Sequence, residues 1–338
     1  MVTLNESVTT PAVKDMRWIR VDDASAIGAC RNAAAAMADG LGFPALRAEQ
    51  LAVAVTEAAS NLHKHARDGA MLVRVCRDAP VPGVEMITLD SGPGLRDVGA
   101  AMRDGHSTAG TLGIGLGAIR RMADTSDVYS SAGRGTVVVA RFWPRPQSAQ
   151  FKCAGLTRPI TGETVCGDAF AAVRAGDVLT GVLCDGLGHG SRAAEAADEA
   201  VRAVLEQPGS EPGDLVRLVH QRLSGTRGGA VAVVQVTGSA VRFAGLGNVA
   251  AWIIAAGHRS GLVSVPGIAG HQARSIRTFD YQLPAGAAIV LHSDGLTSRW
   301  DIQALPGLES RDPLVIAAVL LAEAGVHRDD AGILVLKP

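Results

Sequence analysis

The sequence predicts a mixed α/β (α+β) chain of two domains, an α/β unit followed by stacked β-sheets flanked by helices. Its 338 residues exceed the usual size of a single hydrophobic core. Residues 17–142 combine helical and strand periodicities, whereas the chain from Phe151 onward consists of short apolar runs bounded by glycine or polar turns. Residues 143–150 include two prolines and break all periodicity. We therefore expect domains at 15–142 and 151–338, joined by this linker.

The first domain reads as a strand, two helices, two strands, a glycine-rich stretch, a helix and two closing strands. The first helix is rich in alanine and ends at glycine, and the second begins near Pro44. The buried face of the second helix is expected to contain Leu46, Leu51, Val55, Ala58 and Leu62. The expected strands are 17–21, 71–76, 84–90, 126–131 and 135–143, and the expected helices are 24–41, 46–66 and 114–123.

The second domain is dominated by apolar runs of strand length. The expected strands are 176–185, 229–236, 240–247, 249–256, 287–294 and 331–337, and the expected helices are 191–206 and 313–324. Such a pattern is typical of two sheets that pack on each other and are covered by helices.

Composition limits the function classes. The chain is 47% hydrophobic and 19% charged with a net charge of -1, so nothing in its bulk charge attracts nucleic acid. The five cysteines show no metal-ligand spacing and are expected to be buried, reduced thiols. We find no membrane-length apolar run and no signal-peptide pattern at the N-terminus, which predicts a cytoplasmic protein without a membrane partner.

Two polar residues stand one turn apart on the second helix. Glu57 and Asn61 are at positions i and i+4, so they share one face. A carboxylate there can hold a hydroxyl or a water, while the amide oxygen can coordinate Mg²⁺. Taken alone, the pair is more often an ordinary solvated helix face.

Glycine-rich segments follow in the same domain. Asp90 ends an apolar strand and can accept a hydrogen bond from an exocyclic amine, and Gly92 and Gly94 allow a flat ring to approach the backbone. Further on, three glycines precede the third helix, where free amides attract phosphate; these are Gly113, Gly115 and Gly117. By itself the first motif, DxGxG, is more often a plain turn, and the second, GxGxG, is equally consistent with a tight turn and close helix packing.

Together these motifs resemble the GHKL (Bergerat) ATPase superfamily, and most closely its RsbT-like switch serine kinases. The matching stretches are TEAASNLHKHA, LDSGPGLRD, AMRDGHSTAGTLGIGLGAIRRMAD and GRGTVV. The resemblance implies an ATP-binding α/β sandwich in which Asn61 binds Mg²⁺, Glu57 activates the attacking serine hydroxyl and Asp90 reads adenine. It also implies that Thr136 supports the adenine pocket and that the three later glycines contact phosphates. Ser60 departs from the arginine that family members tend to carry there.

His63 and His65 raise the alternative of a phosphorylated histidine, as in sensor kinases. They lie at the end of the nucleotide-binding helix, and no separate helical dimerisation segment precedes it. Basic side chains at a helix C-terminus are more simply explained by the helix dipole. A sensor kinase is therefore disfavoured.

Acidic residues end several apolar strands of the second domain: Asp168, Asp185, Asp294, Asp329 and Asp330. Any single one of them is explained equally well by a turn. Several carboxylates gathered at the edges of apolar sheets repel one another unless cations neutralise them, so we expect a bridged pair of divalent metals. Such a pair activates water and holds a phosphate for in-line attack.

The motifs DGLGHG and SDGLTS make this half resemble PPM-type phosphatases of the SpoIIE and RsbX branch. The resemblance implies a β-sandwich flanked by helices. It also implies two Mn²⁺ or Mg²⁺ ions held by Asp168, Asp185, the Gly186 carbonyl, Asp294 and Asp329, with Asp330 able to substitute in the last role. His189 either protonates the leaving serine oxygen or fixes its loop. The stretch TRGGAVAVVQV departs from larger relatives and resembles the compact RsbX-like form.

A kinase-like domain fused to a phosphatase implies control of one phosphorylation state, expected on serine or threonine of a STAS-domain protein in a sigma-factor partner-switching pathway. Two alternatives stay open at this level. In one, the N-terminal domain only binds ATP or a partner and regulates the phosphatase. In the other, the chain is a non-catalytic anti-sigma-type binding protein.

Overall fold

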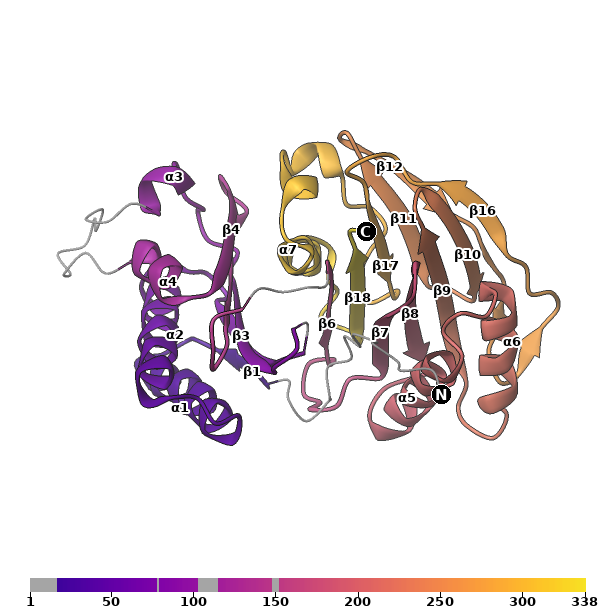
Figure 1. Cartoon of the computed structure of the whole chain (residues 1–338), viewed down its shortest axis with the longest axis horizontal. Helices are drawn as coiled ribbons and strands as arrows, with labels where there is room; N and C mark the ends of the chain where they lie inside the picture. The colour runs from indigo at the N-terminus through magenta and orange to yellow at the C-terminus, as the bar shows by residue number, and fades with distance from the viewer. Residues whose placement is uncertain (1–16, 78, 103–114, 148–151) are drawn as a thin grey trace. The chain divides into compact units, whose positions relative to one another are not determined.

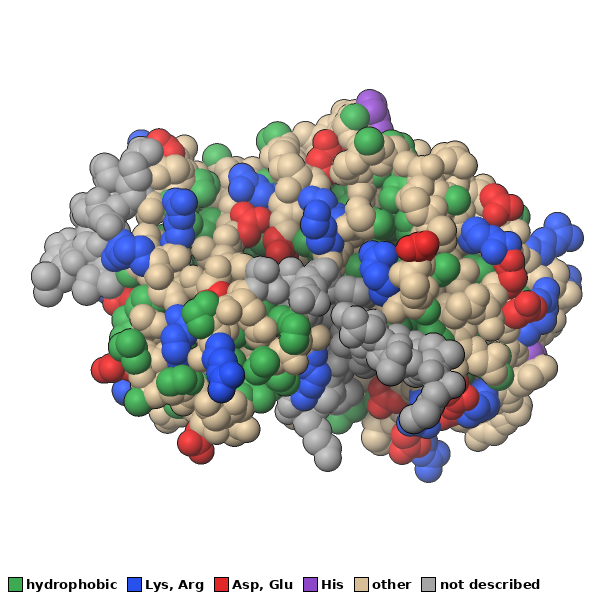
Figure 2. Space-filling model, in the orientation of Figure 1, with side chains coloured by type: hydrophobic (Ala, Val, Ile, Leu, Met, Phe, Trp, Pro, Cys, Tyr) green, Lys and Arg blue, Asp and Glu red, His purple; other side chains and the backbone are tan. Residues whose placement is uncertain are grey.

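The computed structural model describes residues 17–77, 79–102, 115–147 and 152–338. Within these residues the chain divides into two compact units, 17–147 and 152–338 (Figure 1). On the face shown in Figure 2, acidic and basic side chains are interspersed. None of the helices in the described part of the chain is long and apolar enough to cross a membrane.

The N-terminal unit is a five-stranded antiparallel sheet, with strand order β1-β2-β3-β5-β4, and helices α1, α2 and α4 cover one of its faces (Figure 1). Its elements are β1 (Arg17–Arg20), α1 (Ala24–Gly40), α2 (Ala45–His65), β2 (Ala70–Cys76), β3 (Gly83–Leu89), α3 (Val98–Ala101), α4 (Leu116–Met122), β4 (Thr125–Ser131) and β5 (Gly135–Phe142).

Helix α2 is the longest element of this unit and carries the predicted apolar face with one exception. Leu51, Val55, Ala58 and Leu62 are buried, but Leu46 is 67% exposed. Leu46 precedes Leu51 by five residues, which corresponds to a rotation of about 140° around the helix from the buried face. The expectation for Leu46 was therefore wrong, because a spacing of five does not keep two residues on one face.

A buried ion-pair cluster joins three strands of the N-terminal sheet. Glu85 on β3 lies opposite Arg74 on β2 and Arg141 on β5. Both arginine Nε atoms donate to the Glu85 carboxylate at 2.7 Å, and all three residues are buried. Burial alone would raise the pKa of Glu85, but the two guanidinium charges hold it below its ordinary value. The buried carboxylate therefore stays ionised because the two guanidinium groups lie beside it.

The C-terminal unit is a sandwich of two sheets. The first has strand order β13-β10-β9-β8-β7, with β16 also paired to β10, and α5 and α6 pack on it. The second has order β12-β11-β17-β18-β6, and α7 lies beside β6 and β18 (Figure 1). The sheets approach closely, since a Cβ on Gly155 of β6 would lie 2.6 Å from the ring of Phe170 on β7.

The strands of this unit are β6 (Cys153–Arg158), β7 (Asp168–Ala175), β8 (Val178–Gly186), β9 (Gly229–Thr237), β10 (Ala240–Leu246), β11 (Ala250–Ala255), β12 (His258–Leu262), β13 (Ser264–Val265), β14 (Gly267–Ile268), β15 (Gln272–Ala273), β16 (Phe279–Gln282), β17 (Ala288–His292) and β18 (Ala331–Leu336). Its helices are α5 (Ser191–Glu206), α6 (Pro212–Arg222) and α7 (Pro313–Ala324), with short 3-10 turns η2 (Ile302–Ala304) and η3 (Leu308–Ser310). The strands β14 and β15 form a separate two-stranded ribbon.

The mixed fold class and both helices expected in the second domain are confirmed. Helix α6, the short helix α3 and the strands β6, β7 and β12 to β16 were not expected from the sequence. All five cysteines are free and buried, as predicted. Trp143, at the start of the expected linker, is fully buried, and its backbone N–H donates to Asp124.

Candidate functional sites

Glu57 and Asn61 lie on α2, one turn apart, and both are half-buried. The helix positions them because its opposite side is anchored in the core by Leu51, Val55 and Leu62. The side chains are thus held on a rigid element and remain open to solvent. This arrangement is compatible with the predicted contact between a carboxylate, an amide and a bound hydroxyl or cation.

Asp90 follows β3 and begins a tight turn. Its Oδ1 accepts the Gly92 N–H at 2.7 Å, and its own N–H donates to the Thr136 carbonyl at 3.2 Å. Burial raises the pKa of Asp90, although backbone hydrogen bonds partly oppose this. The half-buried carboxylate of Asp90 is therefore held in place by the turn that it begins.

Two glycines allow this turn to pack closely against the β4–β5 hairpin. Gly135 has φ +89°, and a Cβ there would lie 1.8 Å from the Asp90 carbonyl oxygen. Gly94 has φ +72°, and a Cβ there would lie 2.3 Å from the Ser131 carbonyl oxygen. Only glycine fits at either position. Gly135 is consequently a determinant of the Asp90 geometry.

Ser130 is a further residue of this region that the sequence analysis did not single out. Its Oγ lies 2.9 Å from Thr136 Oγ1, accepts the Leu95 N–H at 2.7 Å and donates to the Gly135 carbonyl at 3.0 Å. Ser130 thereby ties the predicted supporting residue Thr136 to the segment that follows Gly94. A serine in a strand gives no signal of such a role in the sequence.

Of the three predicted phosphate-contacting glycines, Gly113 lies outside the described residues. Gly115 is the N-cap of α4, and Gly117 is buried within the first turn of that helix. The expectation that all three precede the helix was wrong for Gly117, because the helix begins at Leu116.

In the C-terminal unit the acidic residues meet at one edge of the sandwich. The expectation that Asp168 ends a strand was wrong, because Asp168 is the first residue of β7. The antiparallel register of β7 and β8 pairs it directly with Asp185. Asp294 follows the end of β17, and Asp329 and Asp330 precede the start of β18, which pairs with β17. The predicted gathering of carboxylates from both sheets is therefore present in the fold.

Ser293 connects the two sheets beneath this edge. Its Oγ donates to Asp168 Oδ2 at 2.6 Å and accepts the Gly332 N–H at 2.9 Å. The other oxygen, Asp168 Oδ1, is buried and has no hydrogen-bond partner among the described residues. A buried carboxylate oxygen without a partner is costly and is suited to a cation.

The electrostatics of the acidic edge also favour a cation. Burial raises the pKa of Asp168 to about 7 and that of Asp185 to about 9, and neighbouring carboxylates add to both shifts. Asp294 is exposed, and its Oδ2 accepts from Asn248 Nδ2 at 2.5 Å. A divalent cation would relieve this mutual repulsion.

The carboxylates are not arranged as a finished ligand cage. Within the described residues, no group of three or more His, Cys, Asp or Glu side chains has metal-binding geometry. The orphaned Asp168 oxygen and the mutual repulsion nevertheless show that these residues fit a cation chemically. The ligand set of Asp168, Asp185, Gly186, Asp294 and Asp329 stays a prediction. Gly186 itself is buried, and a Cβ there would lie 2.1 Å from the Ala193 carbonyl oxygen.

The structure separates the roles of Asp329 and Asp330. Asp330 is buried, and its two carboxylate oxygens accept the N–H groups of Ile160 and Gly167, each at 2.7 Å. Asp329 is exposed and accepts only the N–H of Asp330 among the described contacts. Asp329 is therefore the better candidate ligand, and Asp330 braces the loops of the site.

His189 lies in the exposed turn after β8. Its Nδ1 is 3.3 Å from Glu163 Oε1, and both side chains are largely exposed. Solvent screens this contact, so it holds the ring in place only weakly. His189 stays a predicted acid or loop-fixing residue.

The comparisons with known proteins concern the two units differently. Residues 20–142 match the family described as histidine kinase-like ATPase domain. The serine/threonine-protein kinase RsbT of Bacillus subtilis (strain 168) is 32% identical to this chain over 133 residues, which are 39% of this chain and 100% of that protein. This chain belongs to the histidine kinase-like ATPase family. The N-terminal unit, which matches this family, contains Glu57, Asn61 and Asp90.

Solved structures similar to the chain include a phosphatase-domain fragment of SpoIIE from Bacillus subtilis, described as a PP2C phosphatase domain with part of a regulatory domain. It is 16% identical and has a TM-score of 0.48, covering 76% of this chain and 79% of that one. RsbX in complex with magnesium is 18% identical with a TM-score of 0.46, covering 54% of this chain and 92% of that one.

Within the ATPase-family unit, the structure brings together Asp90, Gly92, Gly94 and Thr136 through the contacts described above. No contact among the described residues joins Glu57 or Asn61 to that group. Their predicted roles toward ATP and Mg²⁺ rest on their place on α2.

Proposed function

We propose that this chain controls the phosphorylation state of a STAS-domain protein in a partner-switching pathway. Its N-terminal unit transfers phosphate from ATP to serine or threonine, and its C-terminal unit removes that phosphate in a metal-dependent reaction. The observation that carries the proposal is the union, on one chain, of a unit similar to an entire serine/threonine kinase and a unit whose sheets bring carboxylates together at one edge.

In the kinase half, Glu57 accepts the proton of the attacking serine hydroxyl, and the serine Oγ forms the new bond to the γ-phosphorus as the bond to ADP breaks. Asn61 binds Mg²⁺ through its amide oxygen. The Asp90 carboxylate accepts a hydrogen bond from the adenine amine. ATP supplies the phosphoryl group, and the chain supplies its orientation.

In the phosphatase half, Asp168, Asp185, the Gly186 carbonyl, Asp294 and Asp329 would hold two Mn²⁺ or Mg²⁺ ions. These ions would supply Lewis-acid chemistry, which activates water and neutralises charge on the phosphate. Ser293 orients Asp168 through its hydrogen bond, and Asn248 orients Asp294. In this proposal His189 gives a proton to the departing serine oxygen.

Phosphate release tests the C-terminal half. The native chain and Asp185→Asn are incubated with a phosphoserine-bearing STAS-domain protein and Mn²⁺, and then with EDTA. We expect release that needs metal and falls at least about 100-fold in the variant, because catalysis depends on the cations that Asp185 helps to hold. Equal release by both proteins would contradict the proposal.

Glu57→Ala tests the N-terminal half against the alternative of a regulatory ATP-binding module. The proposal predicts loss of phosphoryl transfer with ATP affinity preserved. Glu49→Ala, an exposed change on the same helix, is the matched control and should transfer phosphate normally. Phosphoryl transfer that survives Glu57→Ala would overturn the role proposed for Glu57. Phosphoryl transfer that is absent from the native chain would leave only an ATP-binding role for this unit.

A further inference from the structure

Arg227 stands beside the turn that follows Asp185. It precedes β9, and the register of β8 and β9 pairs Gly229 with Gly186. The Leu187 N–H donates to the Gly228 carbonyl at 3.0 Å, which ties the Arg227 segment to the turn at 187–190. Arg227 therefore approaches the acidic edge from the neighbouring strand.

The backbone around Arg227 is fixed. Gly228 has φ +74°, and a Cβ there would lie 2.4 Å from the Ala269 carbonyl oxygen. The Gly228 N–H donates to Thr226 Oγ1 at 3.0 Å, and the Arg227 carbonyl oxygen lies 3.0 Å from His271 Nε2. A rigid support of this kind is typical of residues that must present a side chain accurately.

The guanidinium of Arg227 lies over the turn itself. Its Nη1 is 3.5 Å from the His189 carbonyl oxygen, and a Cβ on Gly188 would lie 3.1 Å from it. The residue is exposed, and within the described residues it forms no ion pair with a carboxylate. By contrast, Arg202 and Arg222 of the same unit both pair with Glu199.

A charge count shows what the proposed phosphatase site still needs. Four ionised carboxylates, those of Asp168, Asp185, Asp294 and Asp329, balance the four positive charges of two divalent cations. A phosphomonoester dianion then enters a site with no net positive charge left to receive it. A nearby guanidinium meets that need, because its planar fork donates two parallel hydrogen bonds to phosphate oxygens.

We infer that Arg227 binds the phosphoryl group of the phosphoprotein substrate next to the turn at 187–190. The inference rests on the proposed phosphatase function and adds a substrate-binding residue to it. Leu187 in the same turn is 50% exposed, so the approach to Arg227 is open to a phosphate carried on a protein surface.

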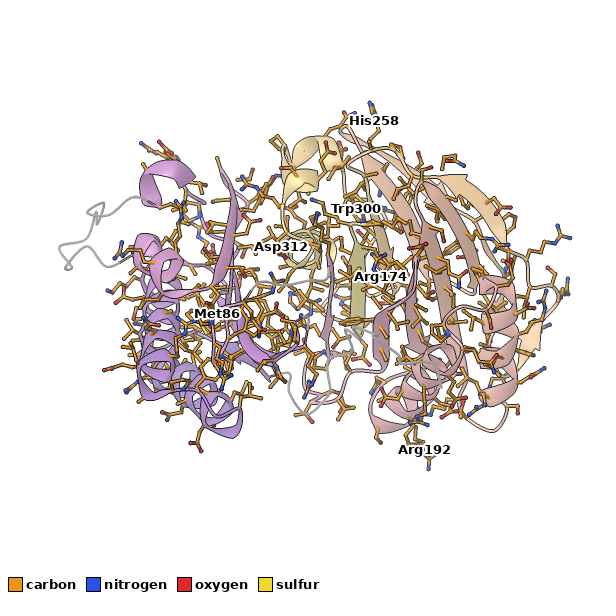
Figure 3. The ribbon with its side chains drawn as sticks, in the orientation of Figure 1. Met86, Arg174, Arg192, His258, Trp300 and Asp312 are labelled. Carbon is orange, nitrogen blue, oxygen red and sulfur yellow. The ribbon has the colours of Figure 1, made fainter. Side chains whose placement is uncertain are left out.

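The test compares Arg227→Ala and Arg227→Lys with Arg192→Ala. Arg192 is an exposed arginine in the first turn of α5, and Figure 3 shows its side chain pointing away from the unit. Three quantities are measured: KM and kcat for a phosphoserine peptide, the dissociation constant of inorganic phosphate for the Mn²⁺-loaded chain by calorimetry, and the affinity for Mn²⁺.

Arg227→Ala should weaken inorganic phosphate binding and raise KM by about 10-fold to 100-fold, the usual effect of losing hydrogen bonds to a charged group. Mn²⁺ affinity should stay unchanged, which also shows that the variant is folded. Arg227→Lys should recover part of the phosphate affinity, because lysine keeps the positive charge but lacks the two parallel donors of the guanidinium group. Arg192→Ala should behave like the native chain.

The possible failures are distinguishable. If the native chain releases no phosphate with any metal, the proposed phosphatase function fails and this inference fails with it. If the native chain is active and Arg227→Ala binds inorganic phosphate within about twofold of Arg192→Ala, only the inference is overturned.

Discussion

The charge of Glu85 should be worth far more to the N-terminal unit than an ordinary surface carboxylate. Glu85→Gln removes the carboxylate that the buried guanidinium groups of Arg74 and Arg141 both contact. Breaking a buried ion pair by removing one partner costs about 3 to 5 kcal/mol. Since 1.4 kcal/mol is about a factor of ten, opening of the sheet should become about 100-fold or more frequent.

Hydrogen exchange of the full chain, read on peptides from β2, β3 and β5, measures that opening directly. The control is Asp22→Asn, which removes an exposed pair with Arg20 and should change stability by no more than about 1 kcal/mol. The pH dependence gives a second check. Because the folded-state pKa of Glu85 is lowered, its contribution is complete above the unfolded pKa and is lost as pH falls through the folded one. Equal protection in Glu85→Gln and Asp22→Asn would refute the reasoning.

Three further predictions follow from the two sites. Gly135→Ala should weaken ATP binding at least about 10-fold in a fluorescence titration, because its Cβ would overlap the Asp90 carbonyl; unchanged affinity would argue against the adenine pocket. Mn²⁺ affinity, measured by calorimetry, should fall from pH 8 to pH 6, because the raised pKa values of Asp168 (about 7) and Asp185 (about 9) let protons compete with the metal; affinity that rises on acidification would contradict this. Asp330→Ala should lower the melting temperature of the metal-free chain through the loss of two charged hydrogen bonds, about 2 kcal/mol or more, whereas Asp329→Ala should spare it and weaken Mn²⁺ binding; the reverse pattern would exchange their roles.

The fold class and the main helices were predictable because long periodic segments carry a strong signal. Helices α5 and α7 have the bounds that their apolar pattern predicts. Helix α6 was missed because its first residues, Pro212 and Gly213, read as a turn. The available signals were proline in the first turn, Asp214 near the start and Arg222 at the end, which together are typical of a helix.

The sequence predicts a site residue where an acidic side chain follows an apolar strand. It does not predict which residues the strand register brings together. Hydropathy locates Asp185 at the end of a strand, whereas Asp168 begins the unexpected strand β7. Their direct pairing is a property of the β7–β8 register. Ser293 lies 125 positions from Asp168, and the sequence around neither residue indicates their hydrogen bond. The choice between Asp329 and Asp330 likewise depends on which side chain turns inward at the start of β18.

The central claim is that one chain both adds and removes the same phosphate. Its most direct test is to incubate a purified STAS-domain protein with ATP labelled in the γ-phosphate, Mg²⁺ and Mn²⁺, and either the native chain, Asp185→Asn or Glu57→Ala. The account predicts that labelled STAS protein accumulates with Asp185→Asn, stays low with the native chain and never forms with Glu57→Ala. Equal labelling by the native chain and Asp185→Asn, or labelling by Glu57→Ala, would contradict it.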